Sequence, residues 1–376
     1  MTAAPTALRA ARVLTPDRVL SPGWVVVAGE RIGAVGQGPG PSDAHDLGDV
    51  SLAPGFVDLH SHGGGGAAFT EGRDAARTVL AAHRVHGTTA MMASLVTDTI
   101  AHLEQQIRSL TPLVEAGELL GIHLEGPWLS PRHRGAHDAG LLRAPAPADV
   151  ERLVEAGAVR MVTLATELPG GLDAVRHLAA RGVVAALGHS DATYAQAQAA
   201  VASGVRVATH LFNAIRPVHH RDPGAALALL DHPETVVELI ADGVHVDPAV
   251  LAHAARAKPG RFVLVTDAMA AAGCADGEYR LGPLPVRVRG GTARLVDGGA
   301  IAGSTLTLDR AVAYMHREAG LPLLDAVNAA SLVPADVVGR RDLGRIVPGA
   351  AAHLVVLDPD LAVRGVVHKG RWAVAP

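Results

Sequence analysis

The segment PGFVDLHSHGGGG, residues 54–66, shows the pattern that decides the fold, an apolar strand that ends in polar side chains. His60 and His62 are two positions apart, so on a strand both imidazoles lie on the same face. The four glycines that follow let the backbone bend around a bound group. Two polar loop residues are the ordinary explanation of such a pair. This pair, however, ends an apolar strand, and histidine is the commonest metal ligand. The context therefore favours a metal site.

Seven further segments follow the same plan, and alanine-rich helical stretches separate most of them. Near-continuous apolar strands that alternate with helices are typical of parallel strands buried on both faces. Eight such units predict an α/β fold, a (β/α)₈ TIM-like barrel. The strands are expected at residues 55–60, 88–94, 120–125, 160–166, 183–189, 206–211, 236–241 and 261–266, and the helices include 73–86, 100–116, 148–156, 172–181, 194–203, 305–319 and 322–330.

Both ends of the chain have a different character, with short strand-like segments and turns but no helical period. Chain termini often lie close together, so these two ends can pair. We therefore expect a small β-sandwich domain formed by residues 1–53 and 345–376, and a barrel formed by residues 54–344. Residues 278–295 predict an inserted β-hairpin that turns at Gly290 and Gly291.

The composition excludes several classes of protein. The 376 residues are 49% hydrophobic, which excludes a disordered or collagen-like chain. A net charge of −4 offers no basic surface, so nucleic acid is not an expected partner. The single cysteine, Cys274, cannot form an intrachain disulfide. Residues 1–20 lack a signal-peptide pattern, and the chain has no apolar run of about 20 residues. We expect a soluble cytoplasmic protein with no membrane contact.

The C-terminal ends of the expected strands carry side chains of the types that bind metals. In a barrel the active site lies at this edge, because the loops there converge on the axis. A single histidine at such a place is often a buried core residue. Here that explanation would have to hold separately for histidines at the ends of several strands, so a shared site is favoured. The residues at these ends are His60, His62, His123, Glu125, His189, His210, Asp242, His245 and Asp267.

Glu125 and Asp267 are carboxylates at the ends of apolar strands, where an unpaired charge would be costly to bury. Beside a cation, Asp267 would stay ionised and could take a proton from water. The alternatives are a solvated loop acid for Glu125 and a turn or helix-capping residue for Asp267. His123, two residues before Glu125, is better explained as a hydrogen-bonded core residue than as a ligand.

The strings around these residues resemble the amidohydrolase superfamily and, within it, the family of N-acetylglucosamine-6-phosphate deacetylases. The resemblance implies a metal-dependent hydrolase that removes the acetyl group from N-acetylglucosamine 6-phosphate, giving glucosamine 6-phosphate and acetate. It also implies that the protein is a homodimer. The substrate that it binds is then a small molecule, an amino sugar phosphate. Besides residues 54–66, the similar strings are HLEGPWLSPRHRGAHD from residue 123, LGHSDATY from 187, THLFNAIRPVHHRDPG from 209, ADGVHV from 241, LVTDAM from 264 and IAGSTLTLD from 301.

The resemblance also implies metal ligands. Glu125, His189 and His210 correspond to the ligands of the main divalent ion. His60 and His62 correspond to a pair that some members keep and that can hold a second ion, so one or two ions per subunit are expected. Imidazole and carboxylate ligands admit zinc, iron, manganese or cobalt.

Roles in catalysis and substrate binding are implied in the same way. Asp267 corresponds to the catalytic acid/base, and His137 to a catalytic residue near the acetamide carbonyl. Arg221 corresponds to a contact with the sugar phosphate. The substrate-binding positions are Ala136, His137, Asn213, Ala214, Arg221, His245, Ala302, Gly303 and Ser304.

Two alternatives to this function stay open. One is a related amidohydrolase, such as a deacylase of N-acyl amino acids or an adenine deaminase. The other is a member of the superfamily without catalytic activity that serves as a binding or scaffold protein. The run HHRD at residues 219–222 favours a phosphorylated substrate, and the presence of Asp267 favours an enzyme because a scaffold needs no proton shuttle.

Overall fold

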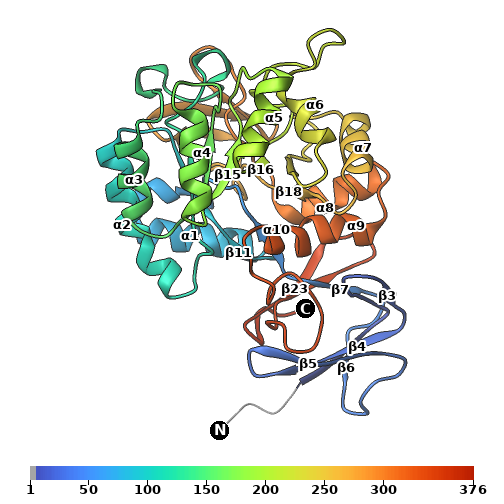
Figure 1. The fold of residues 1–376 in the computed structure, drawn as a ribbon. Helices are drawn as coiled ribbons and strands as arrows, with labels where there is room; N and C mark the ends of the chain where they lie inside the picture. Colours follow the sequence, from blue (N-terminus) through green and yellow to red (C-terminus); the bar gives the residue numbers. More distant parts are fainter. Residues whose placement is uncertain (1–5) are drawn as a thin grey trace.

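The computed structural model describes residues 6–376, and its larger part is a curled parallel sheet surrounded by helices (Figure 1). Residues 1–5, which the sequence analysis assigns to the small β domain, lie outside the described residues. Seven parallel strands form one sheet in chain order. They are β12 (Ala93–Val96), β13 (Ile122–Glu125), β14 (Val159–Leu164), β15 (Val184–Leu187), β16 (Val205–Ala208), β17 (Val236–Leu239) and β18 (Phe262–Leu264).

The two edges of this sheet are linked through the first expected strand. β8 (Phe56–Asp58) pairs in parallel with β11 (Thr88–Met91), which leads directly into β12. On the other side, Asp267 N donates to His60 O at 2.8 Å, and a parallel bridge joins Ser61 to Ala268. Each of the eight expected segments contains a strand, although residues 88–94 form two. The predicted α/β fold with a curled, TIM-like parallel sheet is therefore confirmed.

Helices cover the outer face of this sheet (Figure 1). Local signals set their ends: α5 begins after Thr193, whose side chain accepts a hydrogen bond from Gln196 N, and it ends at Gly204. Within residues 6–376, no helix combines the length and the apolar character needed to cross a bilayer. The α-helices are α1 (Arg73–Arg84), α2 (Ile100–Glu115), α3 (Pro147–Glu155), α4 (Gly171–Ala180), α5 (Tyr194–Ser203), α6 (Gly224–Asp231), α7 (Pro248–Ala257), α8 (Leu308–Arg317), α9 (Leu323–Ala329) and α10 (Leu332–Val337), and the short 3₁₀ helices are η1 (Phe69–Glu71), η2 (Pro131–His133) and η3 (Ala139–Leu141).

The two ends of the chain meet in a six-stranded sheet with the order β24-β23-β22-β7-β2-β3. A four-stranded sheet, β5-β4-β1-β6, shares a buried apolar cluster with it that includes Val13, Val25 and Val356. Residues 7–14 have the sequence pattern of one strand, but they form two strands that belong to different sheets. These strands are β1 (Thr6–Ala10), β2 (Arg12–Leu14), β3 (Val19–Leu20), β4 (Gly23–Ala28), β5 (Arg31–Gln37), β6 (His45–Asp46), β7 (Ser51–Pro54), β22 (Leu354–Leu357), β23 (Val363–His368) and β24 (Arg371–Val374).

The expected hairpin is a three-stranded antiparallel sheet of β19 (Gly277–Leu281), β20 (Leu284–Arg289) and β21 (Thr292–Leu295). The predicted turn at Gly290 and Gly291 lies between β20 and β21. Leu281 and Val286 of this sheet pack in one buried cluster with Val96, at the end of β12. The insertion therefore lies against the C-terminal edge of the parallel sheet. A second small pair, β9 (Gly63–Gly64) and β10 (Ala67–Ala68), follows β8.

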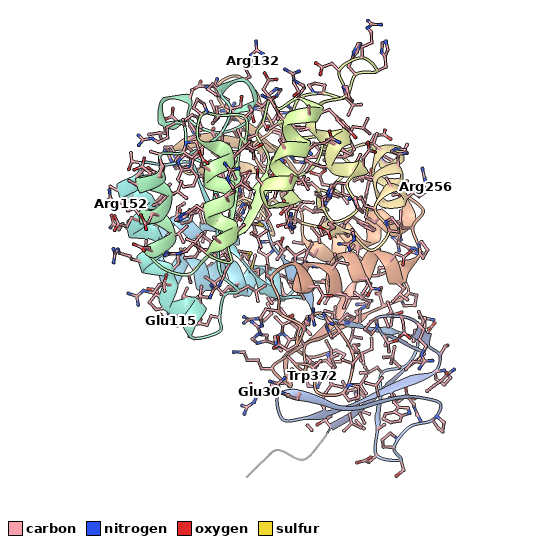
Figure 2. All side chains as sticks on the ribbon, in the orientation of Figure 1. Glu30, Glu115, Arg132, Arg152, Arg256 and Trp372 are labelled. Atoms are coloured by element: carbon pink, nitrogen blue, oxygen red, sulfur yellow. The ribbon has the colours of Figure 1, made fainter. Side chains whose placement is uncertain are left out.

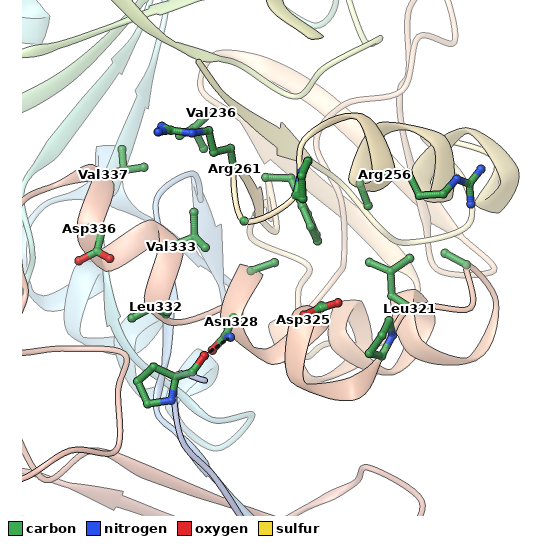
Figure 3. Close-up of a pocket in the computed structure, with 18 of the residues that line it drawn as sticks. Val236, Arg256, Arg261, Leu321, Asp325, Asn328, Leu332, Val333, Asp336 and Val337 are labelled. Atoms are coloured by element: carbon green, nitrogen blue, oxygen red, sulfur yellow. Dashed lines mark hydrogen bonds between the residues drawn. The ribbon is translucent and has the colours of Figure 1, made fainter. Parts of the chain in front are cut away.

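A large cavity of about 1060 Å³ lies at the other end of the parallel strands (Figure 3). Val236 and Phe262, the first residues of β17 and β18, line it together with residues of α9 and α10. Asn328 at its wall donates to Pro16 O at 2.9 Å. None of the residues predicted for the active site lines this cavity.

His353 and His368 pack together, and we expect them to make the stability of the fold depend on pH. Their rings meet edge to face with centroids 4.7 Å apart, and His353 is buried. Burial lowers the pKa of His353 to about 3, with His368 and Lys369 adding to the effect. The unfolded chain therefore takes up this proton near pH 6.5 and the folded chain does not. The free energy of unfolding should therefore fall as the pH drops below 6.5. The contribution of His353 to this fall should be about 2 kcal/mol between pH 7 and pH 5.

Denaturant unfolding at pH 7 and pH 5 tests this expectation. His353→Gln should lose about 2 kcal/mol less than the wild type between these pH values. His253→Gln, at an exposed histidine of α7, is the control and should lose as much as the wild type. Equal losses in all three proteins would contradict the assignment.

Candidate active site

Glu125, at the end of β13, is the centre of the candidate active site. Its Oε1 lies 3.0 Å from His189 Nε2 and 2.9 Å from His210 Nε2, and these two nitrogens are 3.1 Å apart. Its Oε2 lies 3.1 Å from His62 Nε2. His60 Nε2 is 3.2 Å from His62 Nε2 and 3.6 Å from Glu125 Oε1. The structure thus brings together all five side chains that the sequence assigns to metal binding.

These side chains form two groups that share Glu125. In each group the three ligand atoms lie within 4.8 Å of one another, and all the residues are buried. Imidazole nitrogens and a carboxylate oxygen that point at one place are a donor set for divalent transition metals. The chemistry of the residues therefore fits a divalent ion in each group. The groups are His60, His62 and Glu125, and Glu125, His189 and His210.

The backbone is strained where it presents these side chains. His189, His210 and Asp267 have left-handed φ angles of +49°, +26° and +48°. Such angles are uncommon outside glycine, and they cluster at functional sites where the surrounding structure imposes them. Phe212 and Ala214, just after His210, share this conformation. Each strand end therefore turns sharply as it delivers its polar side chain to the edge of the sheet.

Asp267 lies beside the histidines of the first strand. Its Oδ1 is 3.2 Å from His62 Nε2 and 3.4 Å from His60 Nε2. Burial opposes ionisation of Asp267, but His60 and His62 outweigh it and hold the pKa of the carboxyl below its usual value. The predicted segment 302–304 lies directly behind it, since Ser304 N donates to Asp267 O at 2.8 Å. A Cβ at Gly303 would come within 2.8 Å of that oxygen, so glycine is required there.

His137 reaches the same cluster from the loop between η2 and η3. Its Nε2 is 3.4 Å from Glu125 Oε2, and its ring meets the His189 ring edge to face. Burial raises the pKa of Glu125, but His60 and His137 outweigh it and keep that pKa well below its usual range. Burial, with His137 next to it, lowers the pKa of His189 to about 4. His189 is therefore neutral at pH 7, which is the form that binds metals.

The other predicted substrate residues surround the cluster less closely. Asn213 Nδ2 donates to His210 O at 3.2 Å, and Ala214 O accepts from Ser190 N. Ala136 is partly buried next to His137 in the chain and packs against the apolar cluster that includes Leu281 and Val286 of the insertion. His245 Nδ1 is paired with Asp242 Oδ2 at 2.7 Å, and Asp242 belongs to neither ligand group.

Arg221 is exposed and belongs to the segment before α6, a loop that projects from the molecule in Figure 1. Its Nη1 lies 2.7 Å from His220 Nε2. Arg216, at the base of this loop, is paired with Asp191 at 3.2 Å, and Asp191 also binds Arg132 at the rim (Figure 2). The structure therefore anchors the base of the loop and leaves the Arg221 side chain in solvent.

Sequence reasoning missed two buried carboxylates beneath the cluster. Asp58 Oδ1 accepts from His60 N at 3.2 Å, and Asp58 Oδ2 accepts from Thr266 Oγ1 at 2.6 Å. Burial raises the pKa of Asp58 to about 7. Glu238 Oε2 lies 3.1 Å from His60 Nδ1. A charged residue within an apolar strand was the available signal in both cases, in FVDL and in VVELI.

His123 is a buried core residue, as its position in the sequence predicts. Its Nδ1 lies 2.9 Å from Ser94 Oγ, and its Nε2 lies 2.8 Å from Thr163 Oγ1. Both ring nitrogens are thus used by hydroxyl groups. This leaves His123 outside both ligand groups.

Comparison with known proteins agrees with this geometry. The model of the amidohydrolase family matches residues 51–373. The chain is 39% identical to N-acetylglucosamine-6-phosphate deacetylase of Vibrio furnissii over 338 residues, which are 88% of this chain and 84% of the relative. It is 35% identical to N-acetylgalactosamine-6-phosphate deacetylase of Escherichia coli O157:H7 over 97% of this chain and 98% of the relative.

A solved structure is similar over nearly the whole chain. It is an aspartate-to-alanine variant of N-acetyl-D-glucosamine-6-phosphate deacetylase from Mycobacterium smegmatis in complex with N-acetyl-D-glucosamine-6-phosphate. The TM-score is 0.97 and the identity 45%, with 99% of this chain and 100% of the other covered. A family model that spans most of the chain, and relatives of this identity and coverage, lead to one assignment: the chain belongs to the amidohydrolase family.

Proposed function

We infer that this chain hydrolyses the acetamide of N-acetylglucosamine 6-phosphate and releases acetate and glucosamine 6-phosphate. The observation that carries this function is the convergence of Glu125, His189 and His210 at the edge of the sheet where barrel active sites lie. Relatives named for this reaction match the chain over most of its length. A binding protein without catalysis would have no use for Asp267 beside these ligands.

We propose that Glu125, His189 and His210 hold the main divalent ion, and that His60 and His62 hold a second one together with Glu125. The distances within both groups support this assignment. Bound there, a divalent ion supplies a Lewis acid that polarises a carbonyl group and makes a water molecule more acidic. Zinc, iron, manganese and cobalt all suit these ligands.

Asp267 is proposed as the acid/base. Its Oδ1 lies 3.2 Å from His62 Nε2 and 3.4 Å from His60 Nε2, so the carboxylate can reach a water molecule bound at the cluster. It takes a proton from that water as the carbonyl carbon is attacked, and it returns the proton to the departing amine nitrogen. His137 donates to the carbonyl oxygen as negative charge develops there, a contribution of roughly 3 kcal/mol for a well-aimed donor.

Arg221 is proposed to bind the 6-phosphate, because a guanidinium group matches phosphate geometry in a bidentate pair. We also propose that the chain is a homodimer. The exposed position of Arg221 on a projecting loop supports a contact with substrate in the partner's site. The remaining substrate contacts are proposed to come from Ala136, Asn213, Ala214, His245 and the segment 302–304.

We propose that the chain is organised as an eight-stranded barrel of residues 54–344 and a β-sandwich domain of residues 1–53 and 345–376. The links of Asp267 and Ser61 across the sheet edges support the closed barrel. The antiparallel pairing of β22 with β7 supports the second domain.

Arg221→Ala should raise the KM for N-acetylglucosamine 6-phosphate by about 10- to 100-fold, the equivalent of one charged hydrogen-bond pair of 1.5–3 kcal/mol. Its effect on N-acetylglucosamine without phosphate should be small. Arg256→Ala, at an exposed arginine of α7, is the matched control and should change neither KM (Figure 2). Equal KM changes for the two sugars would contradict the phosphate role.

The function itself is tested by measuring acetate and free amine released from N-acetylglucosamine 6-phosphate. The protein should be assayed as purified, after chelation, and after addition of each candidate metal. N-acetylgalactosamine 6-phosphate is a second candidate substrate, because the Escherichia coli relative named for it covers 97% of this chain. The ratio of kcat/KM values decides between the two sugars. Absence of acetate with every metal and both sugars would contradict the proposal.

A further inference from the structure

We propose that Glu238 is a positioning residue that orients His60, so that the group of His60, His62 and Glu125 can hold a second divalent ion. Nothing in the reaction as described uses Glu238. The inference rests on the metal chemistry of the proposed function and extends it to a residue that touches neither substrate nor the proposed ions.

Glu238 lies in the middle of β17, and its neighbours Val237 and Leu239 are apolar. Its side chain is 0% exposed. Burying a carboxylate costs free energy unless its oxygens are paired. Within residues 6–376, Glu238 Oε1 has no hydrogen-bond partner. A fully buried carboxylate with one unpaired oxygen needs an explanation. The contacts of the other oxygen, Oε2, provide one.

Glu238 Oε2 lies 3.1 Å from the backbone N of His210 and 3.1 Å from His60 Nδ1. A backbone N–H can only donate, so Oε2 is the acceptor and the His210 amide fixes it in place. In the neutral form that binds a metal, His60 Nδ1 then carries the hydrogen and donates to the same oxygen. This leaves the lone pair of His60 on Nε2, the nitrogen that faces His62 and Glu125.

The contrast with His123 shows what this contact achieves. His123 is equally buried and its ring lies 4.6 Å from that of His60, but hydroxyl groups engage both of its nitrogens. His60 has one nitrogen held by Glu238 and the other directed at the cluster. Outer partners that fix the tautomer and ring orientation of a ligand typically change metal affinity 10- to 100-fold. Glu238 is placed to do this for His60.

The test compares the intact wild-type chain with Glu238→Leu and Glu238→Gln. Each protein is loaded with Zn²⁺ and desalted, its metal content is measured, and each ion is titrated against a chelator. The wild type should hold two ions. In Glu238→Leu the second ion should bind about 10- to 100-fold more weakly, and the first ion should weaken clearly less, since its ligand His210 loses only a backbone contact to Glu238. A merely structural role would weaken both ions alike.

Glu238→Gln keeps an acceptor oxygen but loses the charge, so the second ion should weaken only about tenfold. Thr163→Val is the matched control, because it removes the hydroxyl that holds His123 and should leave both ions unchanged. If Glu238→Leu does not fold, Glu238→Gln decides, and an unchanged second ion overturns the proposal.

The outcomes separate this proposal from the proposed function. A wild-type chain that binds one ion and deacetylates the substrate overturns the role of Glu238 and leaves the function intact. So does Glu238→Leu with a second-ion affinity within twofold of the wild type. A wild-type chain that binds no Zn²⁺ and shows no activity with any metal contradicts the proposed function itself.

Discussion

Asp267→Asn should lower kcat for N-acetylglucosamine 6-phosphate by about 10²- to 10⁴-fold, the usual contribution of a positioned acid/base. Asparagine has the same shape as aspartate but cannot take up or deliver the proton. Because Asp267 belongs to neither ligand group, metal content should stay at the wild-type value. KM should change little, since the substrate contacts remain.

Steady-state kinetics and metal analysis on the same preparation test this result. Asp309→Asn is the matched control, because Asp309 is a largely buried aspartate whose partner is His86 rather than a cluster residue. It should keep wild-type kcat. An Asp267→Asn protein with full activity would remove Asp267 from the mechanism. Loss of metal in that variant would make it a ligand.

Glu125→Gln should lose both ions, because Glu125 is the residue that the two groups share. Replacing the charged carboxylate by a neutral amide weakens a ligand bond directly. We therefore expect more than the roughly 100-fold loss of affinity that outer partners reach. Activity without added metal should fall to background, and a large excess of metal should restore part of it.

Metal analysis after chelation and reloading measures this effect. Glu104→Gln is the control, since Glu104 pairs with Arg108 and Arg152 on the surface helices and should leave both ions in place. A Glu125→Gln protein that retains two ions at wild-type affinity would contradict the assignment of both groups.

The candidate site was largely predictable because its signal is local. An apolar run with a histidine or carboxylate at its end specifies both a buried strand and a polar residue at its edge. Parallel strands place all such ends on one rim, so His189 and His210 could be brought beside Glu125 without knowing any distance. His123 was predictable for the opposite reason, since it lies one pleat deeper within its strand.

Other features depend on contacts between distant segments and were not predictable. The chain changes sheets at Ala11, between β1 and β2, although residues 7–14 have the pattern of one strand. The proposed role of Glu238 depends on its contact with His60, which lies 178 residues earlier in the chain. The base of the loop that carries Arg221 is held by a contact of Arg216 with Asp191, which lies on another segment.

The pairing of β7 with β22 has a consequence for biosynthesis. Leu354 is the partner of Pro54, so β7 lacks this neighbour until the ribosome has reached residue 354. A nascent polypeptide released earlier would expose an open strand edge just ahead of His60 and His62, and such edges promote aggregation. Contacts between segments this far apart also slow folding. A chain released before β22 is made should therefore aggregate, and we do not expect it to give a partly active enzyme.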